Sequence, residues 1–142
     1  MPITADAELR DLLESARTIA LVGASNRPER DSYDVMGVLL DHGYRVIPVN
    51  PNLAGKTIHG CRVVADIAGI EERIDIVDVF RRSSEVPAVV AEAIAAGAGA
   101  VWMQLGVVHP EAAASAEAAG LKVVMDRCPK IDLARLRIAR RG

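Results

Sequence analysis

A short glycine turn between an apolar run and a helical pattern is the part of this sequence best suited to bind a ligand. The apolar run from Thr18 to Val22 is typical of a buried parallel strand. Gly23, Ala24 and Ser25 follow it, and a helical pattern begins near Ser32. The first turn of such a helix directs unpaired backbone N–H groups and the positive end of the helix dipole toward the space above the sheet. We therefore expect an anionic ligand, such as a phosphate group, at this turn.

The histidines and acidic residues show no pattern that is typical of a catalytic or metal-binding site. His42, His59 and His109 have no nucleophile and carboxylate beside them in the arrangement of a triad. No group of His, Cys, Asp and Glu residues has the spacing of metal ligands. We therefore expect no catalytic residues and no metal site, and a binding protein rather than an enzyme.

Cys128 is the one candidate for a reactive thiol. It follows the last predicted strand, so it should lie at the edge of the sheet where the ligand is expected. Arg127 and Lys130 beside it would favour the thiolate. A buried, inert cysteine is the alternative, and burial is among the commonest states of this residue.

Composition narrows the class of protein. The 142 residues suit a single domain with one core. The chain is 51% hydrophobic and 3% aromatic, so Val, Ile, Leu and Ala must fill the core, as in a sheet covered by helices on both faces. A net charge of −2 gives no reason to expect nucleic acid or an anionic membrane as a partner. Two cysteines without a signal peptide or a membrane-length apolar run are typical of a cytoplasmic protein.

The order of apolar runs and helical patterns predicts an α/β fold. We expect strands at residues 18–22, 44–49, 61–64, 74–80, 100–105 and 121–125. Helical patterns lie at residues 32–42, 83–96 and 110–119, after a first helix that Thr4 would cap. Ser83 or Ser84 would cap the helix at residues 83–96. Residues 131–141 predict a short basic helix or a frayed tail, more typical of a solvated helix end than of a nucleic-acid site.

Strands that alternate with helices at this spacing form a parallel sheet through right-handed crossovers. We expect a doubly wound, mostly parallel, Rossmann-like sheet with helices on both faces, in the strand order 3-2-1-4-5-6. Residues 1–142 would form one domain, with a core from about residue 18 to 131. The ligand crevice should then open where the loops after the strands converge.

Basic side chains are frequent in the loops that follow the predicted strands. These residues are Arg27, Arg30, Lys56, Arg81, Arg82, Arg127 and Lys130. An acidic protein thus places cations on the expected rim of the ligand site, although Glu29, Asp31, Glu85 and Asp126 lie there too. The alternative is that these are solvated loop charges with no ligand.

The sequence disfavours two common nucleotide motifs. The dinucleotide fingerprint needs further glycines after Gly23 and an acidic residue at the end of the second strand. Ser25 and Pro28 occupy the glycine positions, and the second strand ends at Asn50. Gly55-Lys56-Thr57 resembles the end of a P-loop, but Asn50 stands at the position of the leading glycine. NAD(P) binding is therefore the weaker alternative.

Five sequence blocks in the same order resemble the small stand-alone CoA-binding proteins. The blocks are Gly23-Ala24-Ser25 with Arg30 and Ser32-Tyr33, Val46 to Pro51 with Asn50, Asp75 to Arg82, Val101 to Val107, and Val123 to Cys128. This family is similar to the N-terminal, Rossmann-like domain of the succinyl-CoA synthetase alpha subunit. The resemblance extends from about residue 19 to 131. One departure is Asp31, where the family commonly has proline before the Ser-Tyr pair.

The resemblance implies a role for each block. Gly23, Ala24, Ser25 and Ser32 would contact phosphate oxygens, although Ser32 could instead only cap its helix. Arg30, Lys56 and Arg81 would reach phosphates from the neighbouring loops. An apolar seat for adenine would consist of Val79, Phe80, Val86 and Pro87, although Phe80 could instead fill the core. Tyr33, Asn50, Pro51 and Cys128 complete the predicted cofactor-binding residues.

The resemblance implies coenzyme A or acyl-CoA as the ligand. The phosphohistidine domain and the ATP-grasp partner of succinyl-CoA synthetase have no counterpart in 142 residues. We expect a non-catalytic carrier, sensor or regulatory module, with no nucleic acid or membrane partner. A small CoA-dependent redox or acyl-transfer protein is the alternative, in which Cys128 would form a mixed disulfide with the CoA thiol.

Overall fold

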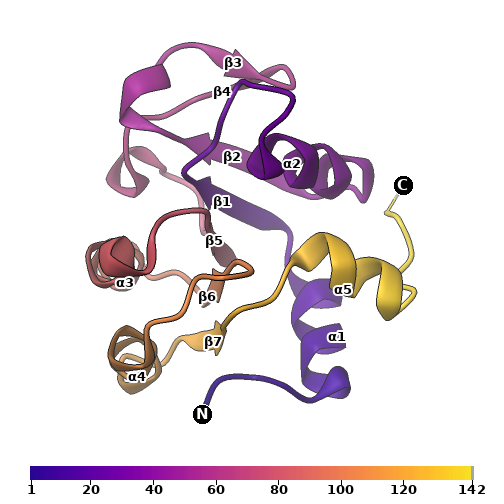
Figure 1. The fold of residues 1–142 in the computed structure, drawn as a ribbon, viewed down its shortest axis with the longest axis vertical. Coiled ribbons are helices and arrows are strands. Elements are labelled where there is room, and N and C mark those ends of the chain that lie inside the picture. Colours follow the sequence, from indigo (N-terminus) through magenta and orange to yellow (C-terminus); the bar gives the residue numbers. More distant parts are fainter. Residues whose placement is uncertain (142) are drawn as a thin grey trace.

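Five parallel strands form the central sheet of the computed structural model, which describes residues 1–141 (Figure 1). The strands are β1 (Thr18–Val22), β2 (Arg45–Val49), β5 (Ile76–Val79), β6 (Ala100–Met103) and β7 (Lys122–Val124). Their order in the sheet is β2-β1-β5-β6-β7, and every neighbouring pair is parallel. The predicted Rossmann-like α/β fold is thus confirmed.

Helices cover both faces of the sheet, as predicted (Figure 1). Helices α1 (Asp6–Ser15), α2 (Asp31–Asp41) and α5 (Pro129–Arg135) share one core cluster with the sheet. Helices α3 (Val86–Ala95) and α4 (Pro110–Ala118) share the other. Alternate residues of each strand enter opposite clusters, so Leu21 packs toward α2 while Val22 packs toward α3. The loops that follow the strands therefore lie at the carboxyl edge of the sheet, between the two layers of helices.

The predicted third strand is reduced to one bridging residue. Val64 makes a parallel bridge to Val49 at the edge of β2. The residues before it form β4 (Cys61–Arg62), which pairs antiparallel with β3 (Thr57–Ile58). His59 and Gly60, both at positive φ, form the tight turn between these two strands. This hairpin diverts the chain, so only its end reaches the sheet.

Two predicted helix caps are wrong. Ala5 precedes α1 without a side-chain hydrogen bond, so Thr4 is not the cap. A short 3₁₀ turn over Ser83–Glu85 precedes α3, and neither serine caps that helix. The Ser83 hydroxyl instead accepts a hydrogen bond of 3.0 Å from the backbone N–H of Val108. Ser83 therefore joins the loops after β5 and β6.

Residues 136–141 do not form a frayed tail. The Arg141 guanidinium donates hydrogen bonds to the carbonyl groups of Leu13, Glu14 and Ala16, which end α1. It also lies over the Tyr44 ring, 4.9 Å from the ring centre. A cation at the carboxyl end of a helix satisfies carbonyl groups that have no helical partner. Residues 136–141 thus attach α5 to α1. No helix among residues 1–141 has the length and apolarity to cross a membrane.

Candidate functional site

Gly23 places the glycine turn directly against the end of β5. Its φ of 87° is in the left-handed region, and a Cβ atom there would lie 2.2 Å from the Phe80 carbonyl oxygen. The N–H groups of Gly23 and Ala24 both donate to the Val49 carbonyl, at 3.0 and 3.3 Å. These two amides therefore fasten the turn to β2 and do not face a ligand. The turn's ligand-facing donors must come from the residues after Ala24.

The two serines of the turn differ in their surroundings. Ser25 is half-buried, and its hydroxyl accepts a hydrogen bond of 3.1 Å from the N–H of Arg27. Ser32 is buried at the second position of α2, whereas Arg30 holds the N-cap position. Ser32 therefore does not act as the helix cap. Both serines lie where the start of α2 meets the carboxyl edge of the sheet.

Asn50 fastens the second loop to the first. Its amide nitrogen donates to the Ala24 carbonyl at 2.8 Å, and its amide oxygen accepts from the N–H of Asn52 at 2.8 Å. Both ends of the side chain are thus engaged within the protein. Asn50 positions the glycine turn, and Pro51 begins the short helical turn that follows.

A cavity of about 540 Å³ lies beside the turn, between the ends of β1 and β2 and the start of α3. Its lining mixes apolar side chains with charged ones. The lining residues are Val22, Val49, Pro51, Ala65, Asp66, Arg81, Ser84, Glu85, Ala88, Val89 and Glu92. Arg81 is its one cation, and the Arg81 guanidinium lies 3.9 Å from a Glu85 carboxylate oxygen. We call this space the α3 cavity.

The four residues predicted to seat adenine do not form one surface. Val79 and Val86 are fully buried in the core beneath α3. Phe80 packs partly buried against the opposite core, because neighbouring residues of a strand point to opposite faces. Pro87 is exposed and lines a separate cavity of about 300 Å³ between α3 and α4. The four residues therefore do not line one cavity.

The sequence contains signals for the lining residues that the prediction missed. Ser84, Ala88 and Glu92 are spaced four residues apart. In the predicted helix they therefore lie on one side. Asp66 follows the bridge at Val64 and therefore lies at the carboxyl edge of the sheet. Hydrophobic patterning directs attention to the buried side of α3, whereas the α3 cavity is lined by the adjacent side.

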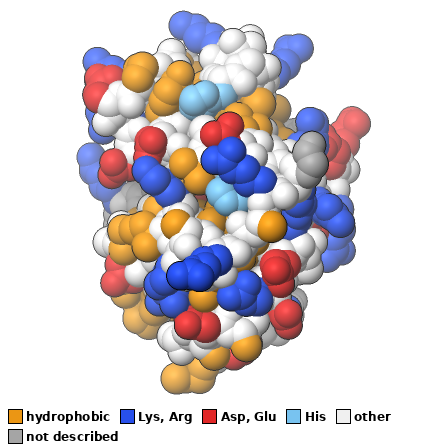
Figure 2. Space-filling model, turned by 90° about the vertical axis from the view of Figure 1, so that its right-hand side faces the viewer, with side chains coloured by type: hydrophobic (Ala, Val, Ile, Leu, Met, Phe, Trp, Pro, Cys, Tyr) orange, Lys and Arg blue, Asp and Glu red, His pale blue; other side chains and the backbone are white. Residues whose placement is uncertain are grey.

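Four of the predicted rim cations make no ion pair among residues 1–141. Arg27, Arg30 and Lys56 are exposed in the loops after β1 and β2, and Arg82 is exposed after β5. Exposed cations near the start of a helix attract phosphate groups. Opposite charges instead lie side by side on the molecular face that carries α2, α5 and α1 (Figure 2).

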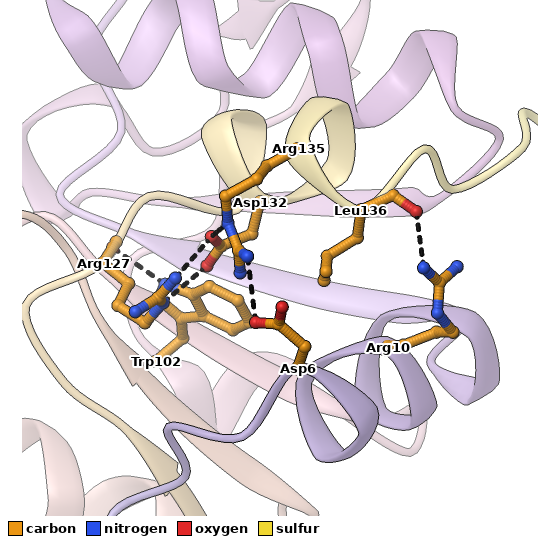
Figure 3. Close-up of polar contacts among 7 residues, drawn as sticks. All are labelled: Asp6, Arg10, Trp102, Arg127, Asp132, Arg135 and Leu136. Carbon is orange, nitrogen blue, oxygen red and sulfur yellow. Dashed lines mark hydrogen bonds and ion pairs between the residues drawn. The ribbon is translucent and has the colours of Figure 1, made fainter.

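Arg127 and Lys130 are both paired with carboxylates. Arg127 donates two hydrogen bonds of 2.8 Å to the buried Asp132 carboxylate (Figure 3), and Lys130 lies 2.5 Å from Asp34. Both cations next to Cys128 in sequence are thus engaged by carboxylates. Cys128 itself is only 6% exposed and packs in the core at the start of α5.

Tyr33 lies on the outer side of α2. Its ring stacks on His59 with the ring centres 3.9 Å apart, and the His59 ring nitrogen Nε2 lies 2.8 Å from the Tyr33 carbonyl. Both residues line a separate cavity of about 530 Å³ that shares no residue with the α3 cavity. Tyr33 is therefore not brought together with Arg81 and Pro51.

The chemistry of these groups fits a nucleotide ligand. The α3 cavity offers apolar walls for a base and carboxylates that can accept hydrogen bonds from an amino group. The turn and the unpaired Arg27, Arg30 and Lys56 can hold phosphates. Among residues 1–141, no group of three or more His, Cys, Asp or Glu side chains is arranged to hold a metal ion.

Comparisons with known proteins agree with this geometry. The model of a family described as a CoA binding domain matches residues 17–134. The uncharacterized protein YneT of Bacillus subtilis (strain 168) is 39% identical over 125 residues, which cover 88% of this chain and 91% of YneT. The structure of cell-free ID.343 from Thermus thermophilus superposes with a TM-score of 0.90 at 41% identity, over 94% of this chain and 99% of that one.

A more distant structure shares only the fold. A dinucleotide forming acetyl-coenzyme A synthetase from Ca. Korarchaeum cryptofilum, solved with phosphate and ADP, matches with a TM-score of 0.68 at 20% identity. The match covers 82% of this chain and 28% of the synthetase. The family match extends from just before β1 into α5, and so includes the glycine turn and every loop at the carboxyl edge of the sheet. The chain therefore belongs to the CoA-binding domain family.

Proposed function

We propose that the protein binds coenzyme A or acyl-CoA without converting it chemically, as a carrier, a sensor or a regulatory module. The observation that carries the proposal is the juxtaposition of the glycine turn, the unpaired cations of the adjoining loops and the α3 cavity. The family match supports coenzyme A over other nucleotides. Both cysteines are unpaired, which is common in the reducing cytoplasm, where we expect the protein to act.

The ligand would lie across the carboxyl edge of the sheet. The adenine ring would enter the α3 cavity, and the diphosphate would lie over the turn that begins at Ser25. Lys56, Arg30 and Arg81 surround this path from the loops after β2, β1 and β5, and their charges would meet the phosphates. Asp66 and Glu92 would accept hydrogen bonds from the base.

Binding without chemistry is favoured by the state of Cys128. The thiol is buried, and the guanidinium and ammonium groups next to it in sequence are engaged by carboxylates. A reactive cysteine needs exposure and a cationic environment. If the protein used the thiol, incubation with CoA disulfide would give an adduct that mass spectrometry detects and that Cys128→Ser removes.

Isothermal titration of the protein with CoA, acetyl-CoA, dephospho-CoA and NAD tests the proposal. We expect CoA and acetyl-CoA to bind and NAD to fail. Binding of NAD without CoA would overturn the proposal.

The same titration with Lys56→Ala locates the phosphates. If Lys56 contacts the 3′-phosphate, the substitution should weaken the binding of CoA by about fivefold to tenfold. The affinity for dephospho-CoA, which lacks this phosphate, should be nearly unchanged. Lys122→Ala is the matched control, because Lys122 is exposed at the start of β7, at the opposite edge of the sheet. An equal loss in the two variants would exclude a local role for Lys56.

A further inference from the structure

Three buried oxygen atoms of neighbouring strands lack any hydrogen-bond partner among residues 1–141. They are both carboxylate oxygens of Asp78 and the amide oxygen of Gln104. Asp78 is 0% exposed and Gln104 is 7% exposed. Buried polar atoms nearly always have a partner, because leaving one without a partner costs about 1–3 kcal/mol. These three unpartnered atoms, on two neighbouring segments of the sheet, therefore need an explanation.

Both side chains point to the same face of the sheet. Asp78 lies on β5 two residues after Ile76 and two residues before Phe80, which follows the strand, and both of these residues pack against the core beneath α2 and α5. Gln104 comes two residues after Trp102 and directly after the end of β6, so the alternation of the strand places it on the face of Trp102. The Gln104 N–H donates to the Val79 carbonyl, which extends the ladder to this position. Gln104 is thus at the carboxyl edge, and Asp78 lies deeper in the sheet.

Gln104 also lies on the far side of the glycine turn from the α3 cavity. The cavity adjoins the ends of β2 and β1, the turn lies between β1 and β5, and Gln104 follows β6. A ligand with its base in the cavity and its diphosphate at the turn would extend its remaining part toward β6, roughly 10 Å from β1 at the spacing of parallel strands. In coenzyme A that part is the pantetheine arm, which carries two amide N–H groups, a hydroxyl and a thiol.

We propose that Gln104, with the buried Asp78 carboxyl deeper on the neighbouring strand, forms a hydrogen-bonding subsite for the pantetheine arm. The inference rests on the proposed function, because it assigns a place to one part of the same ligand. The Gln104 amide oxygen would accept a hydrogen bond from an amide N–H of the arm. A buried amide that meets its partner only in the complex contributes to affinity and not to folding.

Asp78 favours this arrangement through its protonation state. Burial without a partner raises the pKa of the Asp78 carboxyl well above its usual range. The neutral carboxyl has an O–H group that donates a hydrogen bond, in addition to a carbonyl oxygen that accepts one. The subsite therefore combines donors and acceptors beneath an amide-rich ligand.

The test compares coenzyme A with a fragment that lacks the arm, 3′-phosphoadenosine 5′-diphosphate. Wild type and Gln104→Leu are titrated with both, and the melting temperature of each free protein is measured. We expect Gln104→Leu to weaken the binding of CoA by about fivefold or more, which corresponds to the loss of one hydrogen bond. The affinity for the fragment should not change. The free variant should melt at the same or a higher temperature, because a buried orphan oxygen is removed.

The controls separate the possible failures. Leu105→Ala changes the exposed neighbour in the same loop and should alter neither affinity. Unchanged CoA affinity with a lower melting temperature in Gln104→Leu would show a structural glutamine and overturn the subsite. Equal loss of CoA and fragment would also overturn it, since the arm would not be what Gln104 contacts. Failure of wild type to bind CoA at all would instead overturn the proposed function, and the subsite with it.

Discussion

Gly23 sets the distance between the glycine turn and β5. The missing side chain allows the Phe80 carbonyl to approach, and the positive φ aims the next residues over the sheet. Two hydrogen bonds to Val49 and one from Asn50 hold the turn in place. The turn therefore has little freedom to shift and make room for a side chain at position 23. The shape of the glycine turn therefore depends on this single position.

Gly23→Ala should destabilise the protein by more than the cost of a positive φ. The new Cβ atom would overlap the Phe80 carbonyl oxygen at 2.2 Å, and we expect a loss of roughly 2–4 kcal/mol in urea unfolding. Gly120→Ala is the matched control. Gly120 has a φ of 91° but no atom within 4 Å of the added Cβ, so it should lose only roughly 1 kcal/mol. Similar losses at both positions would contradict the contact with β5.

The sequence is informative about the types of residues at the site and less so about where their side chains point. Gly23 could be predicted because a glycine directly after a buried strand indicates a turn or a close backbone approach that a side chain would not allow. Val79 and Phe80 could not be assigned to one adenine seat, since their opposite orientations follow from the strand's exact register against β1. The amide of Asn50 is likewise used by the turn itself, which only the tertiary fold shows.

At the scale of elements, an ion-pair network around the buried Asp132 attaches α5 to the rest of the protein. Asp132 is 1% exposed and accepts two hydrogen bonds from Arg127 and one of 3.3 Å from Arg135 (Figure 3). The Arg127 carbonyl accepts a hydrogen bond of 2.9 Å from the Trp102 indole, which ties the loop to β6. Arg135 also reaches Asp6 on α1 at 2.9 Å. The position of Cys128 at the start of α5 depends on these contacts.

Asp132→Asn should therefore cost much more than Asp6→Asn. Removing the buried carboxylate leaves the Arg127 guanidinium without its charged partner, and such changes cost roughly 3 kcal/mol. Asp6 is 63% exposed, and losing an exposed ion pair costs at most about 1 kcal/mol. Urea unfolding of both variants measures the difference. Equal stabilities would mean that the network contributes no more than a surface pair.

The elements themselves show which local signals suffice for prediction. Five strands and their order follow from apolar runs separated by helical patterns, and the structure confirms them. The run at residues 61–64 has the same appearance, but the turn at His59 and Gly60 pairs it with β3. Capping also escaped prediction, since the Ser83 hydroxyl bonds a loop 25 residues away in sequence.

At the scale of the whole molecule, the stability of the protein should depend on pH through Asp75 and Asp78. These two residues should act in opposite directions. The Asp78 carboxyl has a raised pKa because burial disfavours its charge. The pKa of Asp75 is lowered: burial acts to raise it, but hydrogen bonds from the backbone N–H groups of Thr18 and Arg17 and the nearby Arg73 outweigh burial. Asp78 therefore binds its proton more tightly in the folded protein, and Asp75 binds its proton less tightly.

Linkage fixes the sign of each effect on the free energy of unfolding. For Asp78, the folded state holds more protons above the unfolded pKa, about 3.9, so stability falls as pH rises from there toward the raised folded pKa. For Asp75, the contribution is present above the unfolded pKa and is lost as pH falls through the lowered folded pKa.

Asp78→Asn should thus gain melting temperature relative to wild type as pH rises from 4 to 8. Asp75→Asn should lose most at neutral pH and approach wild type in acid. Differences that stay constant with pH in both variants would show that neither carboxyl changes its proton affinity on folding.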